Sequence, residues 1–155
     1  MKKSFKRKKG PVQSKKITYD GIKFASGLEK YMYIALKKAK IKADYEGQTF
    51  ELVEAFDFNL KSVERQGNGK GEYRDRGNKK IQNIKYTPDF IGSDFIIETK
   101  GRANESFPMR WKLFKKLLTH KNMITQKPIE WTLYKPQNQK ECDETIKLIL
   151  LQQNT

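Results

Sequence analysis

The sequence predicts an α/β fold of the α+β kind, in which helices flank a mixed central β-sheet. Apolar residues recur at helical spacing near the start, the middle and the end of the chain, and short β-rich runs lie between these segments. With 155 residues, of which 36% are hydrophobic, the chain can build one core rather than two. We therefore expect one domain at residues 17–155, preceded by an arm at residues 1–16.

The amino-terminal arm is strongly basic. Residues 1–16 contain eight basic residues and no acidic one. Such a run repels itself and has little to bury, so it predicts a flexible segment that becomes ordered on a phosphate backbone. The arm residues that we expect to bind nucleic acid are Lys6, Arg7, Lys8, Lys9, Lys15 and Lys16.

The first helix is predicted to begin at Ser26, after a short segment that starts near Ile17 and turns at residues 19–22. Ser26 and Glu29 have the spacing of a capping box, in which each side chain satisfies a free amide of the other residue. Apolar residues then recur at helical spacing as far as Ala39 and give the helix one apolar face.

Two segments of different character follow. The run from Tyr45 to Phe58 predicts one or two strands. Residues 61–80 are rich in Gly, Asn and basic residues, which predicts a long loop or the tip of an extended hairpin. Because this segment is positively charged, we expect it to contact nucleic acid, notably through Arg74 and Arg76, with an ordinary flexible insertion as the alternative.

The second half of the chain alternates strands and helices. Two strands are predicted at residues 81–90 and 94–100, joined by a turn at Gly92 and Ser93. A helix from about residue 106 to 118, a strand at 129–134 and a helix at 141–152 complete the domain. The two tryptophans, Trp111 and Trp131, are expected in the core.

The composition argues against several kinds of protein. With one cysteine, Cys142, and one histidine, His120, the chain has no internal disulfide framework, and a common zinc site is nearly excluded. The longest apolar runs are too short to cross a bilayer, and no apolar segment follows the basic start as in a secretory signal. We therefore expect a cytoplasmic protein without membrane association.

The net charge points to a polyanionic partner. Thirty-three Lys and Arg residues against 18 Asp and Glu residues give a formal charge of +15. Nucleic acid is favoured over an anionic membrane, because neither end carries a basic helix with a bulky apolar face. Arg102, before the second predicted helix, and Arg110, within it, are also expected to bind nucleic acid.

Asp89 and Glu98 indicate a metal site. Side chains on a strand alternate between its faces, so Glu98 and Lys100 point the same way, and an antiparallel hairpin brings Asp89 near Glu98. Two close carboxylates repel each other, and a divalent cation removes that cost. Oxygen ligands of this kind suit Mg²⁺, for which Mn²⁺ can substitute. Glu29 is the best further acid, and Lys100 can orient water or stabilise a phosphate.

These residues resemble the signature of the PD-(D/E)XK nuclease superfamily. Asp89 matches its first acid, Glu98-Thr99-Lys100 matches its second part, and eight residues lie between Asp89 and Glu98. A longer series of segments resembles, in order and over roughly residues 22–120, the phage endonuclease I family of Holliday-junction resolvases. The matching segments are Ser26-Gly27-Leu28-Glu29, Ile41-Lys42-Ala43-Asp44-Tyr45-Glu46, Tyr86-Thr87-Pro88-Asp89-Phe90 and Ile97-Glu98-Thr99-Lys100-Gly101.

The resemblance implies a restriction-endonuclease-like core and a Mg²⁺-dependent endonuclease that cuts branched DNA. It makes Asp89 and Glu98 metal ligands, with the carbonyl of Thr99 helping. It makes Lys100 the catalytic lysine and Glu29 the acid from the first helix.

The resemblance also implies a further acidic metal ligand and a dimeric protein. Asp44 falls at a metal-ligand position where the family usually has Glu, and Glu46 is the alternative. The family implies a homodimer, in which the helix carrying the acid can be exchanged between subunits, and a host-cell cytoplasm if the protein is phage-encoded. The connection at residues 61–85 is longer here than in the family.

Three functions follow from these patterns. The first is a structure-selective endonuclease that resolves DNA junctions. The second keeps the nuclease chemistry but changes the substrate, as in nicking, end processing or site-specific cleavage. The third is a nucleic-acid-binding protein without catalysis, which would explain the charge but not the combination of Asp89, Glu98 and Lys100.

Overall fold

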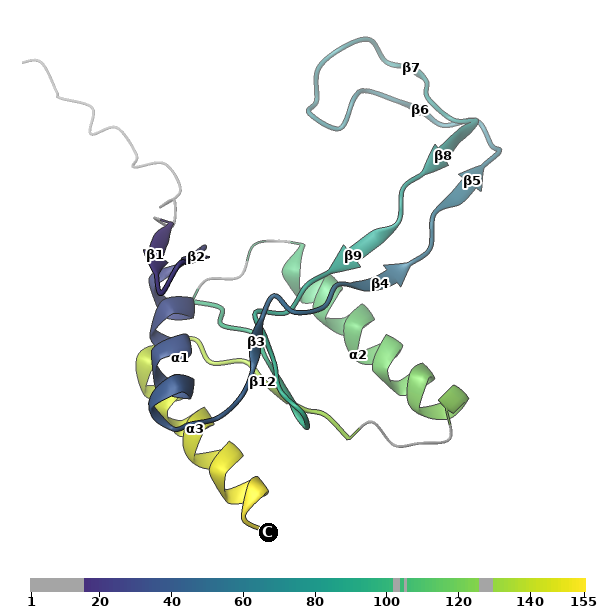
Figure 1. The fold of residues 1–155 in the computed structure, drawn as a ribbon. Helices are drawn as coiled ribbons and strands as arrows, with labels where there is room; N and C mark the ends of the chain where they lie inside the picture. Colours follow the sequence, from purple (N-terminus) through teal and green to yellow (C-terminus); the bar gives the residue numbers. More distant parts are fainter. Residues whose placement is uncertain (1–15, 102–103, 105, 126–129) are drawn as a thin grey trace, which may run out of the picture.

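A computed structural model describes residues 16–101, 104, 106–125 and 130–155 (Figure 1). Most of the predicted basic arm, Arg102 and the side chain of His120 therefore lie outside the described part of the molecule. Within the described residues, no helix is both long and apolar enough to cross a membrane.

The centre of the fold is a four-stranded mixed sheet in the order β12-β11-β10-β3. Its strands are β3 (Asp44–Tyr45), β10 (Phe90–Ile91), β11 (Phe95–Ile97) and β12 (Thr132–Tyr134). β11 runs parallel to β12, whereas β10 is antiparallel to both β11 and β3. This arrangement confirms the predicted class, a mixed sheet flanked by helices.

Helices cover both faces of the sheet (Figure 1). On one face, α1 (Gly27–Lys38) and α3 (Gln139–Gln153) pack over Phe95 and Ile97. On the other face, α2 (Phe107–Thr125) packs over Ile96. Because successive residues of a strand face opposite ways, the three consecutive apolar residues of β11 serve both cores, as expected for a strand covered on both sides.

The amino end of α1 is fixed as its sequence predicts, with one difference. The backbone N–H of Glu29 donates to the side-chain oxygen of Ser26 at 3.2 Å. The carboxylate of Glu29 accepts from the backbone N–H of Ala25, at 2.9 Å, rather than from that of Ser26. A small hairpin, formed by β1 (Ile17–Tyr19) and β2 (Ile22–Phe24), leads into this cap.

A long two-stranded ribbon projects from the body of the molecule (Figure 1). It is built from three successive antiparallel pairs, which we call together the ribbon. The pairs are β4 (Phe50–Val53) with β9 (Ile84–Tyr86), β5 (Phe56–Phe58) with β8 (Lys79–Ile81), and β6 (Val63–Glu64) with β7 (Arg74–Asp75). Residues 61–80 are thus mainly the end of a hairpin rather than a free loop.

The element boundaries differ from the predictions where a strand changes partner. The predicted strand at residues 81–90 is three shorter strands, because β8 and β9 belong to the ribbon and β10 to the central sheet. Pro88 lies at this change, where its missing N–H cannot serve a ladder. β11 ends at Ile97, and α2 continues to Thr125, beyond the predicted end near residue 118.

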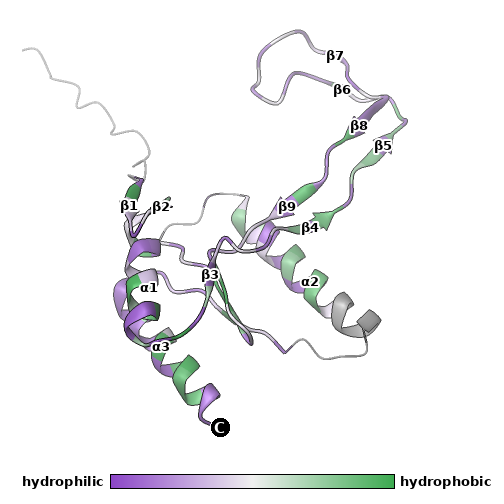
Figure 2. Ribbon diagram, in the orientation of Figure 1, coloured by the Kyte–Doolittle hydropathy of each residue, from purple (hydrophilic) through white to green (hydrophobic). Residues whose placement is uncertain are grey.

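Hydropathy changes along the ribbon. Figure 2 shows hydrophobic residues at β4 and β9, and a mainly hydrophilic end around β6 and β7. At the base, Phe50 and Tyr86 are buried against Phe114 of α2. The base of the ribbon is therefore part of the second core, whereas its end is exposed to solvent.

Candidate active site

The β10–β11 hairpin brings two acidic residues together. Phe90 pairs with Ile97, so Asp89, which precedes Phe90, and Glu98, which follows Ile97, lie at the same end of the hairpin. The backbone N–H and the hydroxyl of Thr99 donate to Oδ2 of Asp89 at 2.7 and 2.6 Å. These two bonds fix the Asp89 carboxylate beside the end of β11.

Glu98 is buried, with 4% of its surface exposed, and both of its oxygens have partners. The hydroxyl of Tyr86 donates to Oε2 at 2.6 Å, and the ammonium of Lys100 lies 3.5 Å from Oε1. The contact with Lys100 confirms that the two side chains share a face of the chain. The ammonium also lies 4.7 Å from the ring centroid of Phe107, which adds a cation–π contact.

Glu29 is a second buried acid, and it makes hydrogen bonds beyond those that cap the helix. Its Oε1 accepts from the hydroxyl of Ser26 at 2.8 Å. Its Oε2 accepts from Ala25 N–H and from the hydroxyl of Tyr45, which donates at 2.7 Å from β3. A cap needs only the local bonds, so the bond from Tyr45 additionally orients the carboxylate relative to the central sheet.

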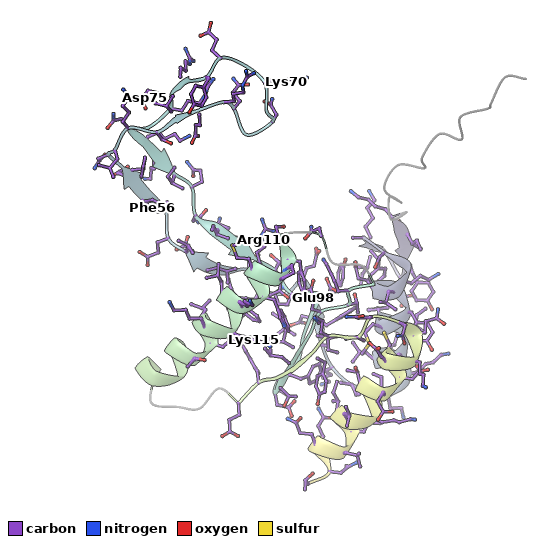
Figure 3. The ribbon with its side chains drawn as sticks, turned by 180° about the vertical axis from the view of Figure 1, so that it is seen from behind. Phe56, Lys70, Asp75, Glu98, Arg110 and Lys115 are labelled. Atoms are coloured by element: carbon purple, nitrogen blue, oxygen red, sulfur yellow. The ribbon has the colours of Figure 1, made fainter. Side chains whose placement is uncertain are left out.

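These side chains line one cavity of about 370 Å³. Its walls include four acids, Glu29, Glu46, Asp89 and Glu98, and the base Lys100. Arg110, near the amino end of α2, also lines the cavity, and Figure 3 shows it above Glu98. The cavity therefore combines a buried acidic floor with cationic groups, an arrangement that suits a metal ion together with a phosphate.

The two hairpin acids hold their protons more tightly than usual. Burial, reinforced by the charge of Glu98, raises the pKa of Asp89 to about 7, although its bonds from Thr99 act in the opposite direction. Burial also raises the pKa of Glu98, while the hydroxyl of Tyr86 and the charge of Lys100 lower it. Two full negative charges are thus unfavourable here unless a cation joins them.

The donor set fits a magnesium ion held by few protein ligands. Among the described residues, no group of three or more His, Cys, Asp and Glu side chains is placed to hold a metal together. Asp89 and Glu98 form a pair of hard oxygen donors, and Mg²⁺ is commonly bound by one or two carboxylates together with water and substrate phosphates. Glu29 lies in the same cavity wall, but is held by its own three donors.

Of the two further acids considered in the sequence, the structure brings Glu46 rather than Asp44 to the cavity. Asp44 is exposed, lies opposite Ile91 in the sheet, and packs its side chain beside Gly47. Glu46 has a positive φ of 48°, and its N–H donates to the carbonyl of Asp89 at 2.8 Å. This turn ends the alternation of β3 and places Glu46 at the cavity.

The residues expected to bind nucleic acid are spread over several parts of the molecule. Arg110 lines the cavity, and Lys16 is exposed before β1. Arg74 is exposed on β7, near the end of the ribbon. The other expected contacts lie outside the described residues; these are Lys6, Arg7, Lys8, Lys9, Lys15 and Arg102.

The side chain of Arg76 is held by hydrogen bonds within the ribbon. Its guanidinium donates to the carbonyl of Glu64 at 3.1 Å and to that of Glu72 at 3.2 Å. The bond to Glu64 joins the two sides of the ribbon's end, whereas the bond to Glu72 is local, so the side chain braces the ribbon in addition to carrying charge.

Sequence reasoning missed the two tyrosines and one lysine of the site. Tyr86 and Tyr45 donate to Glu98 and Glu29, and Lys85 lines the cavity from the base of the ribbon. A buried tyrosine normally finds a hydrogen-bond partner, which is a usable signal. The identity of that partner, however, depends on how the ribbon and β3 meet the sheet.

Comparison with known proteins gives one match to a family model and no match to an individual protein. A family model described as "Protein of unknown function (DUF1064)" matches residues 9–127, which is more than half of the chain. Neither the curated proteins nor the solved structures gave a match.

Proposed function

We propose that this chain, which belongs to the family described as "Protein of unknown function (DUF1064)", is a metal-dependent endonuclease that hydrolyses phosphodiester bonds in branched DNA. Four-way junctions are the proposed preferred substrate. In this proposal the central sheet, with its β10–β11 hairpin and flanking helices, is a restriction-endonuclease-like core of the PD-(D/E)XK type.

The observation that carries the proposal is the convergence of Asp89, Glu98 and Lys100 in one cavity. A protein that only binds nucleic acid needs exposed cations, and gains nothing from burying carboxylates whose pKa values are raised. Buried groups with perturbed pKa values in a cleft are typical of reactive sites. The arrangement therefore favours catalysis over binding alone.

The protein groups have separable proposed roles. Asp89 and Glu98 would hold Mg²⁺, or Mn²⁺ in its place, through carboxylate oxygens that Thr99 and Tyr86 keep oriented. The bound metal would polarise the scissile phosphate and lower the pKa of a bound water. Lys100 faces the same cavity, where its ammonium can orient the attacking water or stabilise negative charge on the phosphate.

Other groups would place the DNA backbone over this centre. Arg110 and Lys85 line the cavity and can bind the phosphates on either side of the one that is cut. Glu29, oriented by Tyr45, would support the centre as a further acid. The formal charge of +15 favours a DNA partner, and the resemblance to junction resolvases favours a branched one.

We also propose that the active form is a homodimer. Resolving a four-way junction needs two paired cuts, and a two-fold dimer supplies two related centres. This part of the proposal is tested by the molar mass of the free protein and of its complex with a junction.

The test is cleavage of a four-way junction and of a linear duplex of the same sequence, with Mg²⁺ or Ca²⁺. We expect the wild-type chain to cut the junction faster with Mg²⁺, and Glu98→Gln and Lys100→Met to abolish cutting while binding persists. Lys140→Met, a change of an exposed lysine on α3, is the matched control and should cut normally.

The other functions give different results in the same experiment. Equal cutting of duplex and junction would indicate a nuclease of another specificity, such as nicking or end processing. Binding without cutting under either metal would indicate a nucleic-acid-binding protein, and would contradict the proposed activity.

A further inference from the structure

The ribbon begins at the wall of the proposed active site. Its β9 strand ends at Tyr86, whose hydroxyl bonds to Glu98, and Lys85 and Thr87 line the same cavity. Thr87 is also joined to Thr49, just before β4, by a hydrogen bond of 2.7 Å between the hydroxyl oxygens. A DNA backbone that enters the cavity therefore meets the base of the ribbon.

The end of the ribbon carries an excess of positive charge. Residues 61–80 contain seven basic and three acidic residues. Two of the acids are occupied within the ribbon: Asp75 accepts the N–H groups of Ser62 and Gly77, and Glu64 pairs with Lys79. Within the described residues, the side chains of Lys70, Arg74 and Lys80 are exposed and have no hydrogen bond or ion pair.

The ribbon also presents an exposed aromatic ring close to these cations. Tyr73 is 70% exposed and stands directly before Arg74. A tyrosine hydroxyl beside cations is a common contact for the phosphates and sugars of duplex DNA. Figure 3 shows Lys70 and Asp75 at the far end of the ribbon, away from Glu98 and Arg110 in the body.

The ribbon is long enough to extend along about one helical turn of duplex DNA. Lys79, at the start of β8, lies seven residues before Tyr86. At about 3.3 Å per residue, this corresponds to about 23 Å along the strand, and Arg74 and Lys70 lie farther from the cavity. Since B-DNA rises about 3.4 Å per base pair, this length along the chain corresponds to at most roughly 7–12 base pairs of a duplex that runs along the ribbon. The major groove is wide enough to admit a two-stranded ribbon.

We propose that the ribbon binds a duplex arm of the DNA substrate about one helical turn from the phosphate in the cavity. This inference rests on the proposed function, because it takes the cavity as the place where DNA is cut. The exposed cations Lys70, Arg74 and Lys80 bind backbone phosphates of that arm. The ribbon thus makes cutting depend on a sufficient length of duplex beside the cut.

A second copy of the chain is a less favourable occupant of the same surface. The exposed Phe56, Leu60 and Val63 are the apolar side chains that such an interface would use. A two-fold pairing of ribbons, however, would bring two ends of like charge together, each with four more basic than acidic residues. Like charges facing each other across an interface cost free energy, whereas a phosphate backbone is attracted by them.

The decisive measurement compares two triple variants of the full chain on junctions with arms of about 5, 10, 15 and 20 base pairs. The test variant carries Lys70→Ser, Arg74→Ser and Lys80→Ser on the ribbon. The control carries Lys38→Ser, Lys42→Ser and Lys140→Ser, which remove the same charge from exposed positions outside the ribbon and the cavity. Affinity is measured with Ca²⁺ at several salt concentrations, and cutting with Mg²⁺.

For the ribbon variant we expect at least tenfold weaker binding of long-armed junctions. Its slope of log Kd against log salt should fall by about 2–3, because each lost phosphate contact accounts for about 0.9. Binding and cutting of junctions with the shortest arms should stay near wild type, and the control should lose less than one unit of slope. Glu72→Gln, which removes the remaining acid, should change the affinity in the opposite direction.

Three results would overturn the inference. One is an equal loss in the ribbon and control variants, which would reveal only a general effect of net charge. Another is an equal loss for short and long arms. The third is a change of the ribbon variant from dimer to monomer with an unchanged salt slope, which would make the ribbon a protein interface.

The failure of the proposed activity is a separate observation. If the wild-type chain cuts no DNA with Mg²⁺, the nuclease proposal fails. The affinities for junctions of different arm length still show whether a duplex arm binds the ribbon. If the chain cuts junctions but the ribbon variant behaves as wild type at all arm lengths, only the ribbon inference fails.

Discussion

The cavity and the ribbon differ in how they carry charge. In the described part of the chain, the buried charged side chains are Glu29 and Glu98, and both line the cavity. On the ribbon, by contrast, most charges are exposed, and those at its end are mainly basic. A chain with a formal charge of +15 thus buries acids at one place and displays bases along an extended element.

The difference separates two kinds of energetic contribution. Burial strengthens electrostatic interactions and perturbs pKa values, so each group in the cavity matters strongly and depends on its neighbours. Exposed charges are screened by salt, so each contributes little by itself and their sum depends on ionic strength. Changes in the cavity should therefore alter chemistry, and changes on the ribbon should alter binding and its salt dependence.

The largest expected effect is on cutting by Lys100→Met and Glu98→Gln. Each should lower the single-turnover rate by about 10³-fold or more, because the proposed mechanism uses Glu98 to hold the metal and Lys100 to stabilise charge on the phosphate. Affinity for the junction, measured with Ca²⁺, should change less than threefold for Lys100→Met. Loss of affinity that accounts for the loss of rate would make Lys100 a binding residue only.

The second effect compares the stability of the body with that of the ribbon. Phe114→Ala should lower the free energy of unfolding by about 3–5 kcal/mol, because this residue of α2 is fully buried against the base of the ribbon. Replacing residues 61–76 by a short turn should change it by less than about 1 kcal/mol, since these residues bury little. Urea denaturation measures both, and equal losses would contradict an independent ribbon.

The third effect concerns pH in the absence of metal. Asp89 has a pKa of about 7 in the folded chain, against an ordinary value of 3.8. The folded state therefore binds the proton more tightly, so this group favours folding at acidic pH and loses that contribution as pH rises through 7. Between about pH 4.5 and 8, wild type should lose about 2–4 kcal/mol relative to Asp89→Asn.

The exposed ribbon supplies the control for this pH experiment. Asp57→Asn changes an exposed aspartate of β5 and should leave the pH dependence of unfolding at that of wild type. Saturating Mg²⁺ should reduce the loss at pH 8, because in the proposed site the metal binds the deprotonated carboxylate. A wild-type stability that rises between pH 4.5 and 8 relative to Asp89→Asn would contradict the assignment.

The smallest effect is expected from the tyrosines. Tyr86→Phe removes the donor to Glu98 while keeping the ring against Trp111 and Phe114, so it should lower the cutting rate by about 10–100-fold. Its substrate affinity should be unchanged, which separates orientation of the carboxylate from DNA binding. Tyr19→Phe, on the exposed β1, is the matched control.

The local patterns predict much of this fold and of the cavity. Period-two alternation predicts that Glu98 and Lys100 share a face, and hairpin pairing predicts that Asp89 lies beside Glu98. The spacing of Ser26 and Glu29 predicts the start of α1. These predictions succeed because each depends on residues within one hairpin or one helical turn.

Contacts between distant segments were not predictable in the same way. The bonds of Tyr45 to Glu29 and of Tyr86 to Glu98 join separate elements, and depend on which strands pair. The cavity position of Glu46 depends on a backbone φ of 48°, an unusual conformation for a non-glycine residue. The ribbon was likewise hard to separate from the sheet, because short strands on both sides of Pro88 have similar patterns.

The central claim is that Asp89 and Glu98 together hold a divalent ion beside Lys100. The most direct measurement is a crystal structure of the chain soaked with Mn²⁺, in which the anomalous signal locates the metal. We expect a peak in contact with carboxylate oxygens of both Asp89 and Glu98, and its absence in Asp89→Asn. A wild-type crystal in which Mn²⁺ is bound only elsewhere, or in which these two carboxylates point apart, would contradict the account.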